Sequence, residues 1–425
     1  MALLVFMGSL TVFLFLGVPI AVSVAACAIV LMFYLDFFDT LMMAQRMIGG
    51  TNNFVLMAIP FFILAGEIMA RGGLAERLIN ASNVIVGRIR GGLGYTNLLS
   101  SIMFAGLSGS AVADVAMSGG ILYPMMIKNG YRDNRAMGLI CAGSIVAMII
   151  PPSIPMIVLG TTVGMSISRL FMAGIFPGLV LGISLMVGWF FIVRKDGLTD
   201  TVKFTFKEGA RILFLSLPAL FMPVLIIGGI RFGIFTPTEA GAFSVVYAIL
   251  VCAFIYRGLN FNILWQCLLG AARSTAMVMF IIASAVVVGW LITIARVPDI
   301  AVALFNPLIE HPIILLLSIN LFLFIVGMVM DLTPNILIFA PVLFPIIISA
   351  GIEPHFFAVI MVLNLSIGLL TPPVGNVLLM GCSVGKISFG RMVMGIMPFL
   401  GIELVVLLIF TFFPALVLVP MNFLT

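Results

Sequence analysis

Three prolines interrupt a long apolar stretch of this sequence, where an unbroken membrane helix would otherwise be expected. Residues 149–160 read Ile-Ile-Pro-Pro-Ser-Ile-Pro-Met-Ile-Val-Leu-Gly, with prolines at 151, 152 and 155. Proline lacks the backbone N–H and clashes with the carbonyl one turn earlier, so a continuous helix through this stretch is disfavoured. In a bilayer, such a break is tolerated only where protein or a water-filled cavity covers the freed backbone groups. Residues 149–160 therefore predict a broken helix inside the protein.

The same break returns in the second half of the chain. Residues 370–376 read Leu-Thr-Pro-Pro-Val-Gly-Asn, and Pro372 and Pro373 follow Pro151 and Pro152 by 221 residues. Four more pairs keep this offset: Gly160 and Gly381, Gly106 and Gly327, Pro124 and Pro345, and Gly130 and Gly351. A paired, proline-broken apolar segment in two halves of one chain indicates the binding site of a secondary transporter.

The composition requires a membrane setting. Of the 425 residues, 63% are hydrophobic and only 8% are charged, whereas a soluble domain carries about 25% charged residues. We therefore expect an all-α polytopic membrane protein with spans of about 20 residues. The net charge of +5 is spread along the chain, so it indicates topology rather than nucleic-acid binding.

Motifs for catalysis or metal binding are absent from the sequence. The five cysteines lack CxxC spacing and only two histidines occur, so neither a disulfide framework nor a zinc site is expected. No phosphate loop and no nucleophile elbow can be found, which argues against an enzyme and against an ATP-driven pump. The N-terminus lacks a basic region before its apolar run, so no cleaved signal peptide is expected.

The apolar segments predict two similar halves of opposite orientation. Gly91 to Ile127 is interrupted by glycines and serines and has basic residues at both ends, which predicts a re-entrant hairpin. In the first half the other expected segments are a span at 3–35 kinked at Gly17, an interfacial segment at 37–50, a span at 53–70, a surface helix (or a plain loop) at 74–90, the broken span 137–168 and a span at 170–193. A span at 212–230 inverts the second half, in which we expect spans at 236–256 and 274–295, a hairpin at 311–348, the broken span 356–385 and a last span at 392–418.

These segments group into five regions. They are scaffold helices and an interfacial arm at 1–90, hairpin, broken helix and following span at 91–193, a cytoplasmic loop and linking span at 194–235, scaffold helices and arm at 236–310, and hairpin, broken helix and last span at 311–425. With the N-terminus in the cytoplasm and the C-terminus outside, 16 of the 20 Lys and Arg residues lie inside. The four left outside are Arg46, Arg169, Arg231 and Arg296. This bias follows the positive-inside rule.

Hairpin tips and helix breaks offer backbone carbonyls, and hydroxyl and amide side chains lie beside them. A hard cation such as Na⁺ needs several oxygen ligands, and neutral ones suffice when carbonyls contribute. The candidates are Ser108, Ser110, Ser144, Ser153, Thr333, Asn335, Asn364, Ser366, Thr371 and Asn376, with the flanking Pro152, Pro373 and Gly375. For any single Ser or Thr, the alternative is a hydrogen bond to its own helix.

Charged residues within apolar sequence are costly and point to function. Asp331, at the expected tip of the second hairpin, is a candidate for ion coupling or for substrate binding with Asn376, whereas Asp114 is equally well explained as a helix cap. Arg296 is suited to bind a substrate carboxylate through two hydrogen bonds, with a salt bridge to Asp299 as the alternative. Structural roles are expected first for Glu67, Glu239 and Glu403.

Four motifs together resemble one family. Gly-Leu-Ser-Gly-Ser at 106–110, Ile-Pro-Pro-Ser at 150–153, Thr-Pro-Thr-Glu-Ala at 236–240 and Leu-Thr-Pro-Pro-Val-Gly at 370–375 are similar to the large membrane subunit of TRAP (tripartite ATP-independent periplasmic) transporters. The resemblance covers essentially the whole chain. It implies an elevator-type permease of the bacterial inner membrane that takes up a carboxylate solute with Na⁺.

The resemblance also implies partners and ion ligands. A periplasmic binding protein would deliver the solute, and a small membrane subunit with four helices would complete the scaffold. The family's ion sites carry over to Ser108, Ser110, Ser153, Asp331, Thr333, Thr371 and Asn376. By overall likeness sialic acid is the first substrate expected, and a C4-dicarboxylate is the second.

Two other classes of protein remain as alternatives. A stand-alone Na⁺- or H⁺-coupled carboxylate transporter has the same broad architecture but needs no binding protein, and would transport by itself in liposomes. A membrane-embedded enzyme or a channel is the third possibility. An enzyme needs a polar catalytic constellation, and a channel does not need two inverted halves with matched breaks.

Overall fold

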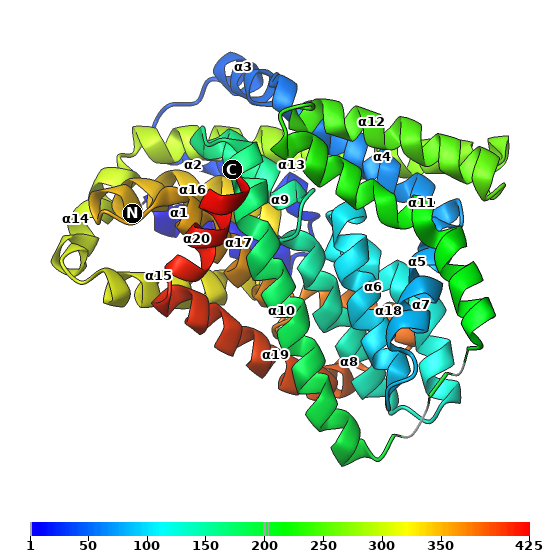
Figure 1. The fold of residues 1–425 in the computed structure, drawn as a ribbon. Helices are drawn as coiled ribbons and strands as arrows, with labels where there is room; N and C mark the ends of the chain where they lie inside the picture. The colour runs from blue at the N-terminus through cyan, green and yellow to red at the C-terminus, as the bar shows by residue number, and fades with distance from the viewer. Residues whose placement is uncertain (1, 199–200, 203) are drawn as a thin grey trace.

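The computed structural model describes residues 2–198, 201–202 and 204–425, and of 3, 14–15, 106–108, 298–299, 301, 303–304 and 306 only the backbone. Within these ranges all regular structure is helical (Figure 1). The first half contains α1 (Ala2–Phe15), α2 (Ile20–Tyr34), α3 (Thr40–Thr51), α4 (Ala58–Arg71), α5 (Leu74–Val86), α6 (Gly92–Ser108), α7 (Ala111–Lys128), α8 (Asp133–Ser144), α9 (Ile154–Val163) and α10 (Ile167–Asp196). After α11 (Phe206–Arg231) come α12 (Pro237–Leu250), α13 (Phe261–Ile294), α14 (Val297–Ile309), α15 (Pro312–Gly327), α16 (Leu332–Ser349), α17 (Pro354–Gly368), α18 (Asn376–Gly385), α19 (Phe389–Phe412) and α20 (Ala415–Leu424).

The predicted fold class is confirmed. Seven helices of the described chain are long and apolar enough to cross a membrane. The offset of 221 residues relates the two ends of α7 to the two ends of α16. The helices on either side, α6, α8, α9 and α10, have their counterparts in α15, α17, α18 and α19. The sequence repeat is thus a structural repeat.

The N-terminal segment differs from the expectation of one kinked span at 3–35. Instead α1 and α2 fold back and pack against each other. Gly17 adopts a left-handed conformation (φ 75°), and the Val18 N–H bonds the Phe13 carbonyl at 3.1 Å. Glycine reaches this conformation without steric cost, and Pro19 supplies no N–H to continue the helix. Each helix is about 22 Å long at 1.5 Å per residue, which is shorter than the hydrocarbon core.

Two other predicted boundaries are wrong. α13 begins at Phe261 rather than near residue 274 and runs unbroken to Ile294. The last span does not continue to 418, because α19 ends at Phe412 and a separate α20 follows Pro414. The segment at 74–90 does form a helix, α5, with Leu74, Leu78 and Ala81 buried.

The first hairpin, α6 and α7, opens at the C-terminal end of α10. The Trp189 Nε1–H of α10 donates to the Gly91 carbonyl at 3.1 Å, just before α6. Beyond the end of α7, Arg132 and Arg135 make ion pairs with Asp196 at 3.6 and 3.5 Å. Both ends of the hairpin therefore meet the same end of one long helix, at the bottom of Figure 1. The hairpin is re-entrant, as predicted.

The second hairpin, α15 and α16, opens at the other end of the molecule. α19 begins near the first hairpin's opening, where Arg391 pairs with Asp133 at 2.7 Å. At the far end of α19, the Thr411 hydroxyl accepts from Asn320 Nδ2 of α15 at 2.9 Å. Asn364 of α17 donates to the Asn320 side chain at 3.1 Å. The two halves are therefore inverted relative to each other.

Helices of the two halves interlock. The second arm of each hairpin packs on the helix that follows the break in the other half, α7 on α18 and α16 on α9. A second group joins α2 and α4 of the first half to α12 and α13 of the second. Figure 1 shows α4, α11 and α12 side by side at one edge of the molecule.

We expect Trp189→Phe to destabilise the junction between α10 and the first hairpin. The indole is fully buried, stacks on Tyr131 with ring centroids 5.9 Å apart, and holds the Gly91 carbonyl. The phenyl ring cannot donate, so the Gly91 carbonyl keeps only the Gly94 N–H at 3.0 Å and loses a hydrogen bond worth about 0.5–1.5 kcal/mol. Thermal unfolding in detergent measures the loss. Trp265→Phe, at a side chain that is 54% exposed, is the control, and equal midpoints for the two variants would contradict the prediction.

Candidate functional site

The first break lies between α8 and α9 and is closed off from lipid. α8 ends at Ser144, one 3₁₀ turn covers Ile145–Met148, and α9 begins at Ile154. The Ser153 hydroxyl caps α9 by accepting from the Met156 N–H at 3.3 Å and donates to the Met148 carbonyl. Every residue from 145 to 160 is buried. The carbonyls freed by the prolines thus point into protein, as a break within a membrane requires.

We expect Ser153→Ala to lower stability by about 1 kcal/mol, the usual value of a helix N-cap. The substitution removes the acceptor for the Met156 N–H. Thermal unfolding of the purified variant measures the loss. Ser166→Ala, which removes the cap of α10 (3.4 Å to the Arg169 N–H) at an exposed position, is the matched control. A smaller loss for Ser153→Ala than for Ser166→Ala would contradict the assignment, because the buried amide has no water to replace the hydroxyl.

The second break repeats this arrangement. α17 ends at Gly368 and α18 begins at Asn376, after Gly375 in a left-handed conformation (φ 57°). The buried Thr371 hydroxyl bonds the Ile367 carbonyl of its own helix at 2.9 Å. Ser144 and Ser366 do the same, to the carbonyls of Cys141 and Val362. For these three residues the alternative of a bond to the residue's own helix is observed.

Each hairpin tip touches the break of its own half. At the second tip, the Val374 N–H donates to the Met328 carbonyl at 3.3 Å, and Gly327 lies against Gly368. A Cβ on Gly368 would lie 2.7 Å from the carbonyl carbon and 2.9 Å from the carbonyl oxygen of Gly327. At the first tip, a Cβ on Gly109 would lie 3.0 Å from the Pro152 carbonyl oxygen. Glycine is required at these positions because two backbones meet there without side chains between them.

A buried oxygen near the second junction lacks a hydrogen-bond donor. Asn335, in the first turn of α16, donates to the Met330 carbonyl at 3.2 Å, but its Oδ1 has no partner among the described residues. The Asp114 carboxylate on α7 is instead paired within its own hairpin, since it accepts from Ser118 at 3.0 Å and also interacts with the side chain of Ser101 on α6. A buried acceptor without a donor is destabilising unless a cation or water binds it. Carbonyl and amide oxygens at the tips thus form a donor set that fits a hard cation.

The Asp331 carboxylate caps the second hairpin's inner helix. It accepts from the Leu332 N–H at 2.9 Å, and the side chain of Asn376 interacts with it across the tip. Thr333 and Asn335 follow on the same turn, and Pro373 lies opposite in the second break. The structure therefore brings together most of the predicted residues of the second half. Ser110 similarly caps α7 in the first half, accepting from the Ala113 N–H at 3.4 Å; the side chain of Ser108 lies outside the described part.

Arg296 is not part of this cluster. It lies exposed at the turn between α13 and α14 with φ 52°, and its side chain forms no hydrogen bond or ion pair with the part of the chain that the structure describes. The side chain of Asp299, its alternative partner, is outside that part. Glu239 has the expected structural role, since it forms a capping box with Thr236 at the start of α12. Glu403 is fully buried in α19.

A cavity of about 610 Å³ separates the first hairpin from the helices packed beside it. Ser110 and Ile154 line it at the tip, and Glu67 and Arg71 of α4, Glu76 of α5 and Ser274 of α13 line the rest of it. Arg71 Nε pairs with Glu67 Oε2 at 3.0 Å, and its Nη1 donates to Gln266 of α13 at 3.3 Å. This space, which we call the tip cavity, extends from a charged pair to a hairpin tip and is large enough for a small organic anion.

The comparison with known families identifies the chain. The profile of "Tripartite ATP-independent periplasmic transporter, DctM component" matches residues 7–416. The chain belongs to this family. The 2,3-diketo-L-gulonate TRAP transporter large permease protein of Escherichia coli (strain K12) is 47% identical over 422 residues, with 99% of each chain covered. The sialic acid TRAP transporter large permease protein of Vibrio cholerae is 36% identical over 401 residues, with 94% of each covered. The resemblance stated from the motifs is confirmed, and these relatives are permease proteins rather than enzymes.

The fold of this TRAP large permease subunit also has a solved counterpart. The YdaH transporter of Alcanivorax borkumensis, whose crystal structure was described as having an unusual topology, matches with a TM-score of 0.58 at 14% identity, over 88% of this chain and 87% of that one. At this identity the match concerns the fold alone.

Sequence reasoning missed the charged side of the tip cavity. Glu67 and Arg71 are four residues apart on α4, which is the spacing of an ordinary helix-stabilising pair. The available signal was their place near the end of an apolar span, where a charged pair is uncommon. Only the approach of α4, α13 and α7 to one space shows that the pair faces the tip of the permease's first hairpin.

Proposed function

We propose that this TRAP large permease subunit imports a carboxylate solute together with Na⁺, with a small membrane subunit and a periplasmic binding protein as its partners. The observation that carries the proposal is the pair of junctions at which each hairpin tip touches a proline break. In transporters with discontinuous helices, such unwound segments provide the carbonyls that coordinate the coupling ion.

The second junction offers the more complete set of Na⁺ ligands. The carbonyls of Gly327, Gly368 and Thr371 and the free Oδ1 of Asn335 are the oxygens we assign to it, with Asp331 supplying negative charge nearby. The first junction is its counterpart and contains Pro152, Ser153 and Ser110. Bound Na⁺ would join tip to break and thereby favour the arrangement that holds the solute.

For the substrate we propose a sugar acid with about six carbons. The support is sequence likeness, because identity to the relative named for 2,3-diketo-L-gulonate (47%) exceeds identity to the one named for sialic acid (36%). This changes the first expectation, sialic acid, which remains the comparison substrate beside a C4-dicarboxylate. In the tip cavity, Arg71 is the cation available to a carboxylate, and Ser110 and Ser274 are hydroxyls available to a polyol.

We further propose that transport proceeds by an elevator movement. The hairpins and broken helices interlock as one body, while α2, α4, α12 and α13 form a second group that packs against it through α13 on α16 and α4 on α6, and the tip cavity lies where these groups meet. Displacement of the first body along the second would carry the tip cavity across the membrane. The bias of Lys and Arg supports a cytoplasmic N-terminus in the bacterial inner membrane.

Uptake into proteoliposomes tests the proposal. The subunit is reconstituted alone and with its two partners, with and without an inward Na⁺ gradient, and radiolabelled 2,3-diketogulonate, sialic acid and succinate are compared. We expect uptake of the sugar acid only with all three proteins and the gradient. Uptake by this chain alone would favour a stand-alone carboxylate transporter, and uptake unaffected by Na⁺ would refute the coupling.

A further inference from the structure

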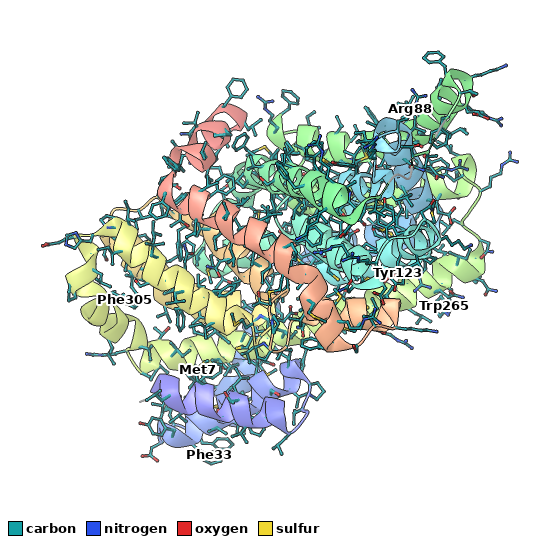
Figure 2. All side chains as sticks on the ribbon, turned by 90° about the horizontal axis from the view of Figure 1, so that it is seen from below. Met7, Phe33, Arg88, Tyr123, Trp265 and Phe305 are labelled. Atoms are coloured by element: carbon teal, nitrogen blue, oxygen red, sulfur yellow. The ribbon has the colours of Figure 1, made fainter. Side chains whose placement is uncertain are left out.

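A second pocket, of about 560 Å³, opens at the basic end of the molecule, away from the tip cavity. It lies between the turn that leads into α6 and the C-terminal end of α10. Arg90, Tyr95 and Arg194 provide its polar wall, and Ile89, Phe190 and Val193 provide an apolar one. Figure 2 shows the neighbouring Arg88 at the rim of the molecule. The pocket is therefore amphipathic and peripheral, unlike the solute cavity.

The two arginines of this pocket have no acidic partner among the residues that the structure describes. Neither Arg90 nor Arg194 forms an ion pair with a described residue, and the Arg194 guanidinium lies over the Phe190 ring, 4.0 Å from its centroid. The carboxylates nearby are already occupied, since Asp196 pairs with Arg132 and Arg135, and Asp133 pairs with Arg391. Two unneutralised guanidinium groups beside one pocket favour an anion, and guanidinium forms two parallel bonds to phosphate.

An exposed apolar stripe on α10 leads to this pocket. Leu179, Ile183, Val187 and Phe190 are all exposed and recur every three or four residues, so they lie on one face of the helix. Arg194 is the next position on that face. α10 has 30 residues, which span about 45 Å and exceed the hydrocarbon core of about 30 Å. The end that carries Arg194 therefore reaches the headgroup level while the stripe faces acyl chains.

We propose that this pocket binds the headgroup of an anionic glycerophospholipid, with the phosphate between Arg90 and Arg194 and the acyl chains along the α10 stripe. The two walls belong to the start of the first hairpin and to the helix that closes its opening. A bound lipid would therefore hold the entrance of the hairpin against α10, beside the Trp189–Gly91 bond. Free inorganic phosphate offers the same charge but cannot use the stripe.

Lipid binding to the purified, delipidated full chain tests this proposal. Native mass spectrometry and thermal unfolding are measured with phosphatidylglycerol, with phosphatidylethanolamine and with inorganic phosphate. We expect phosphatidylglycerol to bind at least about tenfold more tightly than phosphatidylethanolamine and to raise the unfolding midpoint, and inorganic phosphate to have no effect. Equal binding of the two lipids, or stabilisation by phosphate alone, would overturn the assignment.

Matched variants locate the binding. R90Q/R194Q removes the proposed contacts, and K207Q/R211Q removes two charges from exposed positions on α11. We expect the first variant to lose at least about tenfold in phosphatidylglycerol affinity and the second to retain wild-type affinity. R90K/R194K keeps the charge, so its phosphatidylglycerol affinity should lie between those of R90Q/R194Q and the wild type. If R90Q/R194Q fails to fold, R90K/R194K is compared with the wild type in its place. Equal affinities for the glutamine pair and the α11 pair would contradict the proposed site.

Discussion

Alanine at position 368 is expected to weaken the Na⁺ dependence of uptake by more than about tenfold while leaving the subunit folded in the membrane. The added Cβ would lie 2.7 Å from two backbone atoms of Gly327, and backbone cannot move aside as a flexible side chain can. Overpacking of this kind costs about 1–3 kcal/mol or more. The tip of the second hairpin must then move away from the break between α17 and α18, which separates the proposed Na⁺ ligands. We expect the Na⁺ concentration for half-maximal uptake to rise by more than about tenfold, since each 1.4 kcal/mol is a factor of ten.

The control for this variant is Gly390→Ala. Gly390 lies in α19, and a Cβ there meets nothing within 4 Å. Uptake by both variants is measured in proteoliposomes containing the two partners, over a series of Na⁺ concentrations, and size-exclusion chromatography verifies that each is monodisperse. Wild-type Na⁺ dependence in Gly368→Ala would show that the second junction does not hold the ion.

Arg71→Gln should lower uptake by about tenfold or more at subsaturating solute. The guanidinium is the cation that lines the tip cavity, and a hydrogen bond to a charged group is worth about 1.5–3 kcal/mol. The variant also leaves Glu67 without its partner in that cavity, so an anionic solute meets a second carboxylate beside Glu76, which forms no ion pair with a described residue. Both effects weaken solute binding, and we expect the solute concentration for half-maximal uptake to rise while Na⁺ dependence is kept.

Two further variants separate these effects. Arg77→Gln makes the same charge change at a side chain that lies over the Tyr256 ring, 5.5 Å from its centroid, and does not line the tip cavity. Glu67→Gln/Arg71→Gln removes both members of the pair. If the double variant transports like the wild type, Arg71 serves only to neutralise Glu67 and the assignment of a solute contact is wrong.

The breaks could be predicted because Pro151-Pro152 and Pro372-Pro373 each remove two successive backbone donors from an apolar segment. A single proline does not end a helix here, since Pro124 lies inside α7 and Pro345 inside α16. The two halves could be predicted from the repeat, and the ends of α7 and α16 keep its offset at both termini. The fold of the first 35 residues could not be predicted in the same way. Gly17-Val-Pro19 is compatible with a kink or with a reversal, and the choice depends on whether α1 finds a partner in α2. The local sequence predicts that a helix is interrupted, but tertiary contacts determine the angle between the two helices that result.

Part of the candidate site could be predicted from the sequence and part could not. Asn335 and Thr371 could be predicted because each lies next to a proline, and Asp331 because it is an acidic residue within apolar sequence. The tip cavity could not be predicted from the sequence, since its walls come from helices far apart in the chain. Glu67 and Ser274 are more than 200 residues apart, and neither segment carries a sequence pattern that predicts contact with the other.

The interlocking of α7 with α18 has a consequence for biogenesis. Roughly 250 residues separate the end of α7 from the start of α18, which corresponds to about 12–50 s of synthesis at 5–20 residues per second. During that interval the first hairpin, with Asp114 on α7, has to reside in the bilayer without its partner helix. The newly made chain therefore passes through a stage in which a polar, half-finished surface faces lipid or an insertion factor. Ribosome stalling within that interval should leave a cysteine introduced on α7, in a variant without the five native cysteines, open to cysteine-reactive probes, and protection should come only when α18 emerges.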